Sequence, residues 1–135
     1  MAYPLTDIRA IGPEAAAVLK SEGIRTTISL LRSARTPRQR LKIAEKTGAN
    51  EKSVLDWVTC ADRMRVRGVG WEYSELLRAV GVRTVNELKY RNPAKLVDAM
   101  RDAKMQRKLV RLLPSEGTVR RWIESAKKLP ALIRY

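Results

Sequence analysis

The segment Val66-Arg67-Gly68-Val69-Gly70-Trp71-Glu72 has a counterpart 58 residues earlier, Ile8-Arg9-Ala10-Ile11-Gly12-Pro13-Glu14. The likeness continues without a gap, because residues 8–31 can be laid over residues 66–89 with identical pairs such as Leu19 with Leu77, Gly23 with Gly81 and Thr26 with Thr84. Further on, Thr36-Pro37 corresponds to Asn92-Pro93 and, at an offset of 65, Trp57 corresponds to Trp122. Paired landmarks in one order predict an internal repeat.

Both halves of the repeat contain residues that are typical of helix starts and helix ends. Pro13 is placed to start a helix and Gly23 to stop it. Thr36-Pro37 and Asn92-Pro93 are cap-then-proline starts, and Thr84 with Glu87 forms a capping box. Asn50 is positioned to cap a longer helix with an apolar stripe. Because no segment alternates with the period of a strand, the sequence predicts an all-α fold.

The 135 residues fit one domain rather than two. We place the first half at about residues 4–63, the second half at about 64–129, and a tail at 130–135. No flexible linker separates the halves, since the Asn50 helix runs towards the second glycine turn near Arg67. Two halves that share a helix should pack as one compact body around a pseudo-two-fold axis.

The charge is strongly and unevenly basic. The chain has 28 Lys and Arg against 14 Asp and Glu, a net of +14. Residues 1–63 carry 11 basic and 7 acidic side chains, and residues 64–135 carry 17 and 7, so the net charges are +4 and +10. Such an excess favours a polyanionic partner. Nucleic acid is the first candidate, with an anionic membrane surface or an acidic protein as alternatives.

Residue types argue against an enzyme. The chain has no His, which removes the usual general base and the commonest metal ligand, so we expect no metal and no cofactor. Its one cysteine, Cys60, lies on an apolar stripe and is interpreted as a packing residue that cannot form an intramolecular disulfide. With no signal peptide and no apolar run long enough for a membrane span, the expected location is the cytoplasm.

The glycine segments resemble the helix-hairpin-helix motif, in which an apolar-x-Gly-apolar-Gly turn precedes a helix. Residues 66–70 have both glycines, whereas residues 8–12 have Ala10 at the first position. The resemblance implies that the turns offer backbone N–H groups at a helix N-terminus to a phosphate. Two such turns in one domain resemble folds that straddle a DNA minor groove. The whole chain also resembles the bacterial domain-of-unknown-function family 4332.

Two features leave a purely structural interpretation of the turns open. Glu14 and Glu72 lie two residues after the second glycine of each turn, where a carboxylate satisfies the helix dipole and repels a phosphate. Glycine is also what any tight turn between helices uses, whether or not a ligand binds. Trp71 is equally ambiguous, because an aromatic at a turn can contact a sugar or base or can act as a packing lid.

We therefore predict a nucleic-acid-binding set drawn from the turns and from basic helices. On the helices, Lys104, Lys108 and Arg111 fall on one face, so reversing these three charges should weaken binding more than changing Gly12. The full set is Arg9, Gly12, Arg38, Arg40, Arg65, Arg67, Gly68, Gly70, Trp71, Lys104, Lys108, Arg111, Arg120 and Arg121.

The function expected from these residues is sequence-independent nucleic-acid binding, with double-stranded DNA favoured over RNA. The alternative is a protein-interaction adaptor that uses the same scaffold, and it predicts an exposed apolar groove between the halves. Binding of structured RNA shares the charge argument but needs recognition of shape.

Overall fold

The computed structural model describes the backbone of residues 2–107 and 113–135, and the side chains of these ranges except at 105–107. Within them the fold is all-α, and the only β-type pairing is an isolated bridge between Pro4 and Thr26. A short 3₁₀ helix, η1 (Leu5–Asp7), is followed by α1 (Pro13–Ser21), α2 (Thr27–Ser33), α3 (Pro37–Thr47), α4 (Glu51–Arg63), α5 (Trp71–Ala79), α6 (Val85–Leu88), α7 (Pro93–Arg107) and α8 (Glu116–Lys127).

Side-chain caps set most of the helix starts. Thr26, Thr36 and Thr84 each form a capping box, while Asn50 and Ser115 accept a hydrogen bond from the third residue of their helix. The Asn92 amide oxygen likewise accepts from the Lys95 N–H at 3.1 Å. The predicted starts at Pro13, Pro37 and Pro93, and the Thr84 capping box, are confirmed. Among the described helices, α1 and α5 begin without a side-chain cap, at Gly12 and Gly70.

The backbone hydrogen bonds around the two glycine turns recur at the spacing of the sequence repeat. In turn one (residues 8–12) Ile11 donates to Ile8, and in turn two (residues 66–70) Val69 donates to Val66, both at 3.0 Å. After α1 the Ile24 N–H reaches back to the Leu19 carbonyl, and after α5 the Val82 N–H reaches Leu77, both at 2.9 Å. Gly23 and Gly81 adopt φ of 81° and 88° there, as helix-ending glycines do.

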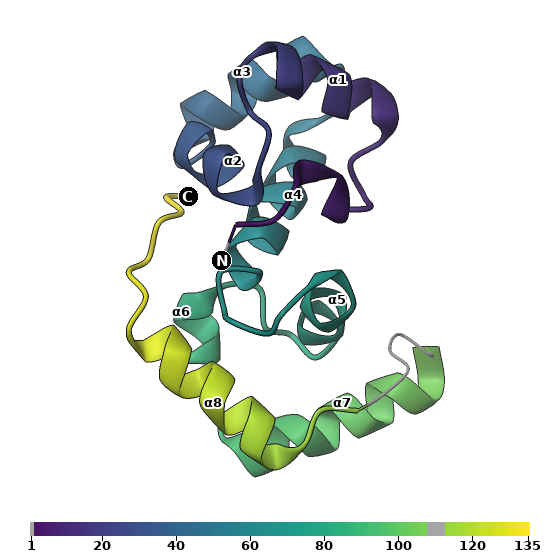
Figure 1. Ribbon diagram of the computed structural model, residues 1–135, viewed down its shortest axis with the longest axis vertical. Coiled ribbons are helices and arrows are strands. Elements are labelled where there is room, and N and C mark those ends of the chain that lie inside the picture. The colour runs from purple at the N-terminus through teal and green to yellow at the C-terminus, as the bar shows by residue number, and fades with distance from the viewer. Residues whose placement is uncertain (1, 108–112) are drawn as a thin grey trace.

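The hydrophobic residues form two cores, one in each half. The first core draws on residues 5–64 and includes Trp57, and the second draws on residues 66–126 and includes Trp122. Both tryptophans are buried, which confirms their predicted place in the core. Figure 1 shows α1 to α3 at one end of the molecule, α6 to α8 at the other, and α4 running between them. Helices α2 and α3 pack on α4, and α6 and α7 pack on α8.

A buried polar cluster at the end of α4 connects the halves. Asp62 accepts from Arg65 Nη1 at 2.9 Å with one carboxylate oxygen and from the Val85 N–H at 2.9 Å with the other. Arg63, whose Nε donates to the Ser74 carbonyl and hydroxyl at 2.9 Å, is fully buried against α5. Burial lowers the pKa of Arg63. The cluster fixes α5 and α6 to the helix that completes the first core.

The tail leaves α8, as expected, and then runs back to the first half (Figure 1). The Arg134 N–H donates to the Arg35 carbonyl at 2.8 Å, and Arg35 Nε donates to the Leu132 carbonyl at 3.1 Å. Ile133 packs against the first core. Residues 130–135 therefore join the second half to the first along a second path, separate from α4.

Candidate nucleic-acid interface

The second glycines of the two turns, Gly12 and Gly70, have ordinary backbone conformations. Gly12 and Gly70 are extended N-cap residues with φ of −69° and −93°, because an N-cap precedes the first helical residue. An added Cβ would meet nothing within 4 Å at either position. Neither backbone strain nor packing therefore explains glycine at these two positions. The lack of a side chain leaves the uncapped starts of α1 and α5 accessible to a ligand.

A hollow of about 530 Å³ lies between the two turns. Arg9, from turn one, lines it together with Gly68 and Gly70 of turn two and with Trp71. Four residues predicted from the sequence, which come from both halves, thus surround one space. We call it the inter-turn hollow; its other lining residues are Thr6, Asp7, Glu72 and Tyr73.

A second hollow, of about 490 Å³, adjoins the first because Gly68 lines both. Arg67 from turn two and Arg121 from α8 line it, and Arg121 Nη2 donates to the Thr118 hydroxyl at 3.2 Å. We call this the α8 hollow; Thr118, Trp122 and Ser125 complete its lining. Gly68 itself has φ of 91°, and an added Cβ would come within 3.4 Å of Trp122 Nε1.

The charges around the two hollows are mixed. Arg9, Arg67 and Arg121 are exposed, and none of them has an ion-pair partner within the described part of the chain. Asp7 and Glu72 line the inter-turn hollow and oppose an anion there. The α8 hollow has no acidic residue among the described residues that line it. Its electrostatics are therefore the more favourable for phosphate.

Trp71 packs in the core, as one of its two sequence interpretations predicts, and also lines the inter-turn hollow. Its side chain is half-buried and packs against the first core, although the residue belongs to the second half. The same residue lines the inter-turn hollow. Tyr73 lies beside it in that lining and stacks obliquely on Trp122, with ring centroids 5.1 Å apart. Trp71 is thus an anchor for turn two that keeps one side accessible.

Arg40 and Arg65 were expected to present exposed guanidinium groups, and the structure corrects this. Arg40 is 5% exposed and donates to the carbonyls of Ala34, Arg35 and Arg134 at 2.7–3.1 Å. Arg65 is 8% exposed, pairs with Asp62, and donates to the Pro130 carbonyl at 2.9 Å. Burial lowers the pKa of Arg40. Both arginines hold the tail in place, so we leave them out of the interface.

Four further predicted residues that lie within the described ranges do not line either hollow. Arg38 lies on α3, at the opposite end of the molecule from α7 (Figure 1), and Lys104 is half-buried on α7. Arg120 is exposed on α8 but pairs with Glu116 at 3.1 Å. Gly12 is exposed at the start of α1. Lys108 and Arg111 lie outside the described residues.

Sequence reasoning missed Thr6, Asp7, Tyr73, Thr118 and Ser125 in the two linings. Asp7 and Tyr73 flank the two turns, so their proximity to the predicted set was a usable signal. Thr118 and Ser125 had a weaker one. They lie three residues before and four residues after Arg121 on one helix, and residues at such spacings share a helix face.

The surroundings of Cys60 are those of a core residue. Cys60 is buried, in contact with the Ser74 hydroxyl at 3.3 Å, and burial raises the pKa of its thiol. This confirms the packing role predicted for it. Across residues 2–107 and 113–135, no cluster of three or more His, Cys, Asp and Glu side chains is placed to hold a metal.

Comparison with known proteins identifies the family. A family model described as "domain of unknown function (DUF4332)" matches residues 9–129, so the chain belongs to this family. No curated protein and no solved structure matched the chain. No helix in the described ranges is long and apolar enough to cross a membrane.

Proposed function

We propose that the chain binds nucleic acid without sequence preference, double-stranded DNA foremost, through phosphate contacts at the inter-turn and α8 hollows. The proposal includes a tandem helix-hairpin-helix arrangement of the two halves. The observation that carries it is the meeting of Arg9 from turn one with Gly68 and Gly70 from turn two around one hollow. The matching hydrogen bonds of the two turns also support a repeated unit.

Phosphate binding would use two kinds of donor. Arg9, Arg67 and Arg121 supply guanidinium groups, which suit phosphate geometry better than lysine does. The start of α5 supplies backbone N–H groups and the positive end of a helix dipole, with no capping side chain in the way. Such contacts carry no sequence information, so binding would be unspecific and strongly dependent on salt.

Mobility-shift titration with a random-sequence duplex at rising salt tests the proposal. We expect binding at low salt that weakens along a straight line in log affinity against log salt. Replacing Arg67 and Arg121 together by Glu should lower that slope by about two, because each phosphate contact contributes about one. The matched control is Lys52→Glu, an exposed residue on α4 outside both hollows. No binding at low salt would sink the proposal.

Competition experiments then rank the nucleic acids. We expect a labelled duplex to be displaced better by unlabelled duplex DNA than by single-stranded DNA or duplex RNA of equal length. A-form RNA presents its phosphates across a different groove geometry, so two fixed turns would fit it less well. Stronger displacement by the RNA would transfer the proposal to structured RNA.

A further inference from the structure

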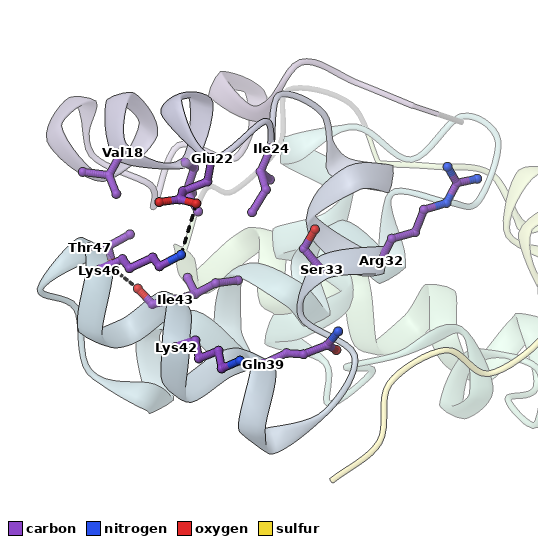
Figure 2. A pocket seen from close by; sticks show the side chains of 11 residues that line it. Val18, Glu22, Ile24, Arg32, Ser33, Gln39, Lys42, Ile43, Lys46 and Thr47 are labelled. Atoms are coloured by element: carbon purple, nitrogen blue, oxygen red, sulfur yellow. Dashed lines mark hydrogen bonds and ion pairs between the residues drawn. The ribbon is translucent and has the colours of Figure 1, made fainter.

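A third concave surface lies in the first half, away from both glycine turns. It occupies the space between α1, α2 and α3 and measures about 390 Å³ (Figure 2). Its floor is apolar: Leu19, Ile24 and Ile43 are buried core residues and Val18 is half-buried beside them. Figure 2 shows Ile24 and Ile43 turned into the space between the helices. We call this surface the α1–α3 groove.

The rim of the groove is basic. Lys42 and Lys46 contribute two positive charges, and Glu22 contributes one negative charge. Arg32 also belongs to the lining, but its guanidinium points away from Glu22 and Lys46 (Figure 2). Lys46 reaches across from α3 to Glu22 at the end of α1, at 3.1 Å, with the two side chains 52% and 43% exposed (Figure 2). An ion pair that exposed stabilises the fold little, so a carboxylate from outside can replace Glu22 as the partner of Lys46.

The equivalent place in the second half differs at the positions that make the groove. Arg91 stands where the first half has Ser33, and its Nη2 donates to the Val80 carbonyl at 3.1 Å across the corresponding space. Counted from the two prolines Pro37 and Pro93, Asp98 and Asp102 stand where the first half has Lys42 and Lys46. These differences, all within the described residues, indicate that the basic rim of the α1–α3 groove does not follow from the helix arrangement alone.

We propose that the α1–α3 groove binds an acidic segment of a partner protein. The segment has one aliphatic or aromatic residue with Asp or Glu on both sides, and the apolar side chain inserts into the groove. The apolar floor suits the side chain, and the excess of rim cations suits the flanking Asp or Glu residues. Phosphates gain nothing from an apolar floor, so the groove favours a peptide over a nucleic-acid backbone. The surface is separate from the two hollows proposed for nucleic acid.

Fluorescence anisotropy with labelled synthetic peptides tests the proposal on the full chain. The probes have about twelve residues with Leu or Phe at the centre and Glu on both sides, a length that covers a groove of this kind. Two control peptides replace the central residue by Ala or the flanking Glu by Lys. We expect saturable binding of the anchored acidic peptides and at least about tenfold weaker binding of both controls. Absence of saturable binding by the anchored acidic peptides would overturn the proposal.

Variants locate the binding. Ser33→Arg combined with Lys42→Asp installs the residues of the second half and should abolish peptide binding while leaving duplex binding intact. Ala17→Arg with Lys20→Asp makes a comparable exchange at exposed positions of α1 outside the groove, and should bind peptide normally. Far-ultraviolet circular dichroism checks that each variant is folded. Peptide binding that survives in the folded Ser33 and Lys42 variant would overturn the assignment.

A variant that should bind the acidic peptide more tightly provides a further test. Glu22→Gln removes the internal competitor for Lys46, so it should tighten peptide binding about two- to fivefold. Glu45→Gln, an equal change of charge on α3 outside the lining, is the control. Equal effects of the two variants, or displacement of the peptide by duplex DNA, would mean that the peptide acts as a general polyanion, and the groove proposal would fail.

Discussion

Turn one and turn two have matching backbone hydrogen bonds but different surroundings. Turn one has Ala10 and leads into Pro13, whereas turn two has Gly68 at positive φ and leads into Trp71, which packs on the opposite core. Turn two also has α8 at its side, which brings Arg121 next to Arg67. The comparison teaches that the same backbone hydrogen bonds occur at both turns, while the chemistry around each turn depends on its individual residues.

The largest expected effect comes from breaking the cluster that supports turn two. Asp62→Ala leaves buried Arg65 without its carboxylate and the Val85 N–H without its acceptor. Removal of one partner from a buried ion pair costs about 3–5 kcal/mol. Urea unfolding measures the change in the free energy of unfolding. Asp56→Ala removes an exposed partner of Arg83 and should cost less than about 1 kcal/mol. Similar losses in the two variants would contradict the structural role of the cluster.

The next largest effect is expected from exchanging Ala10 of turn one and Gly68 of turn two, which should change the free energy of unfolding by different amounts. Gly68→Ala places a Cβ at φ of 91° and 3.4 Å from Trp122 Nε1, so it should cost about 1–3 kcal/mol. The reciprocal change, Ala10→Gly, should cost less than about 1 kcal/mol, through greater freedom of the unfolded chain. Thermal unfolding of both variants provides the measurement. If Gly68→Ala is as stable as the parent, the positive φ and the contact with Trp122 do not require glycine at this position.

The acidic residues beside the turns should have smaller effects, and on binding rather than stability. Glu72 lines the inter-turn hollow, so Glu72→Gln should raise the affinity for a random duplex about two- to fivefold. Glu14→Gln, at the equivalent position after turn one, should raise it less, because Glu14 is absent from the described linings of both hollows. Mobility-shift titration at one fixed salt concentration compares them. A reversed order would move the interface towards turn one.

The smallest effects are expected from the second glycines. Gly12→Ala and Gly70→Ala meet no protein atom within 4 Å, so each should change the free energy of unfolding by less than about 1 kcal/mol. Duplex affinity should nevertheless fall for Gly70→Ala, because the methyl group narrows the approach to the start of α5. Parallel chemical unfolding and duplex titration separate the two effects. Equal duplex affinities of the two variants would show that access at Gly70 does not matter.

Sequence reasoning succeeded where the signal is local. The proline starts at Pro37 and Pro93, the capping box of Thr84 and Glu87, and the helix-ending glycines Gly23 and Gly81 each depend on residues within about a turn of one another. The buried tryptophans also follow from a helical stripe. The all-α fold could therefore be derived from the sequence.

The candidate site was harder to predict from the sequence, because its composition depends on contacts between residues that are far apart in the chain. Arg40 and Arg65 are indistinguishable in sequence from surface arginines, and the tail carbonyls to which they donate, those of Arg134 and Pro130, lie 94 and 65 residues away. The place of Arg9 beside turn two likewise depends on how the halves pack. The sequence shows how many arginines the chain has, but only the tertiary structure shows which guanidinium groups already donate to acceptors within the fold.

The return of the tail to the first half has a consequence for how the molecule opens. A chain with two cores can lose one core while it keeps the other, and local opening then costs less than global unfolding. The Arg134 N–H, hydrogen-bonded to the Arg35 carbonyl, should exchange with solvent only when the tail detaches. Its exchange rate, compared with that of α4 amides, therefore reports whether the tail detaches on its own or only when α4 unfolds.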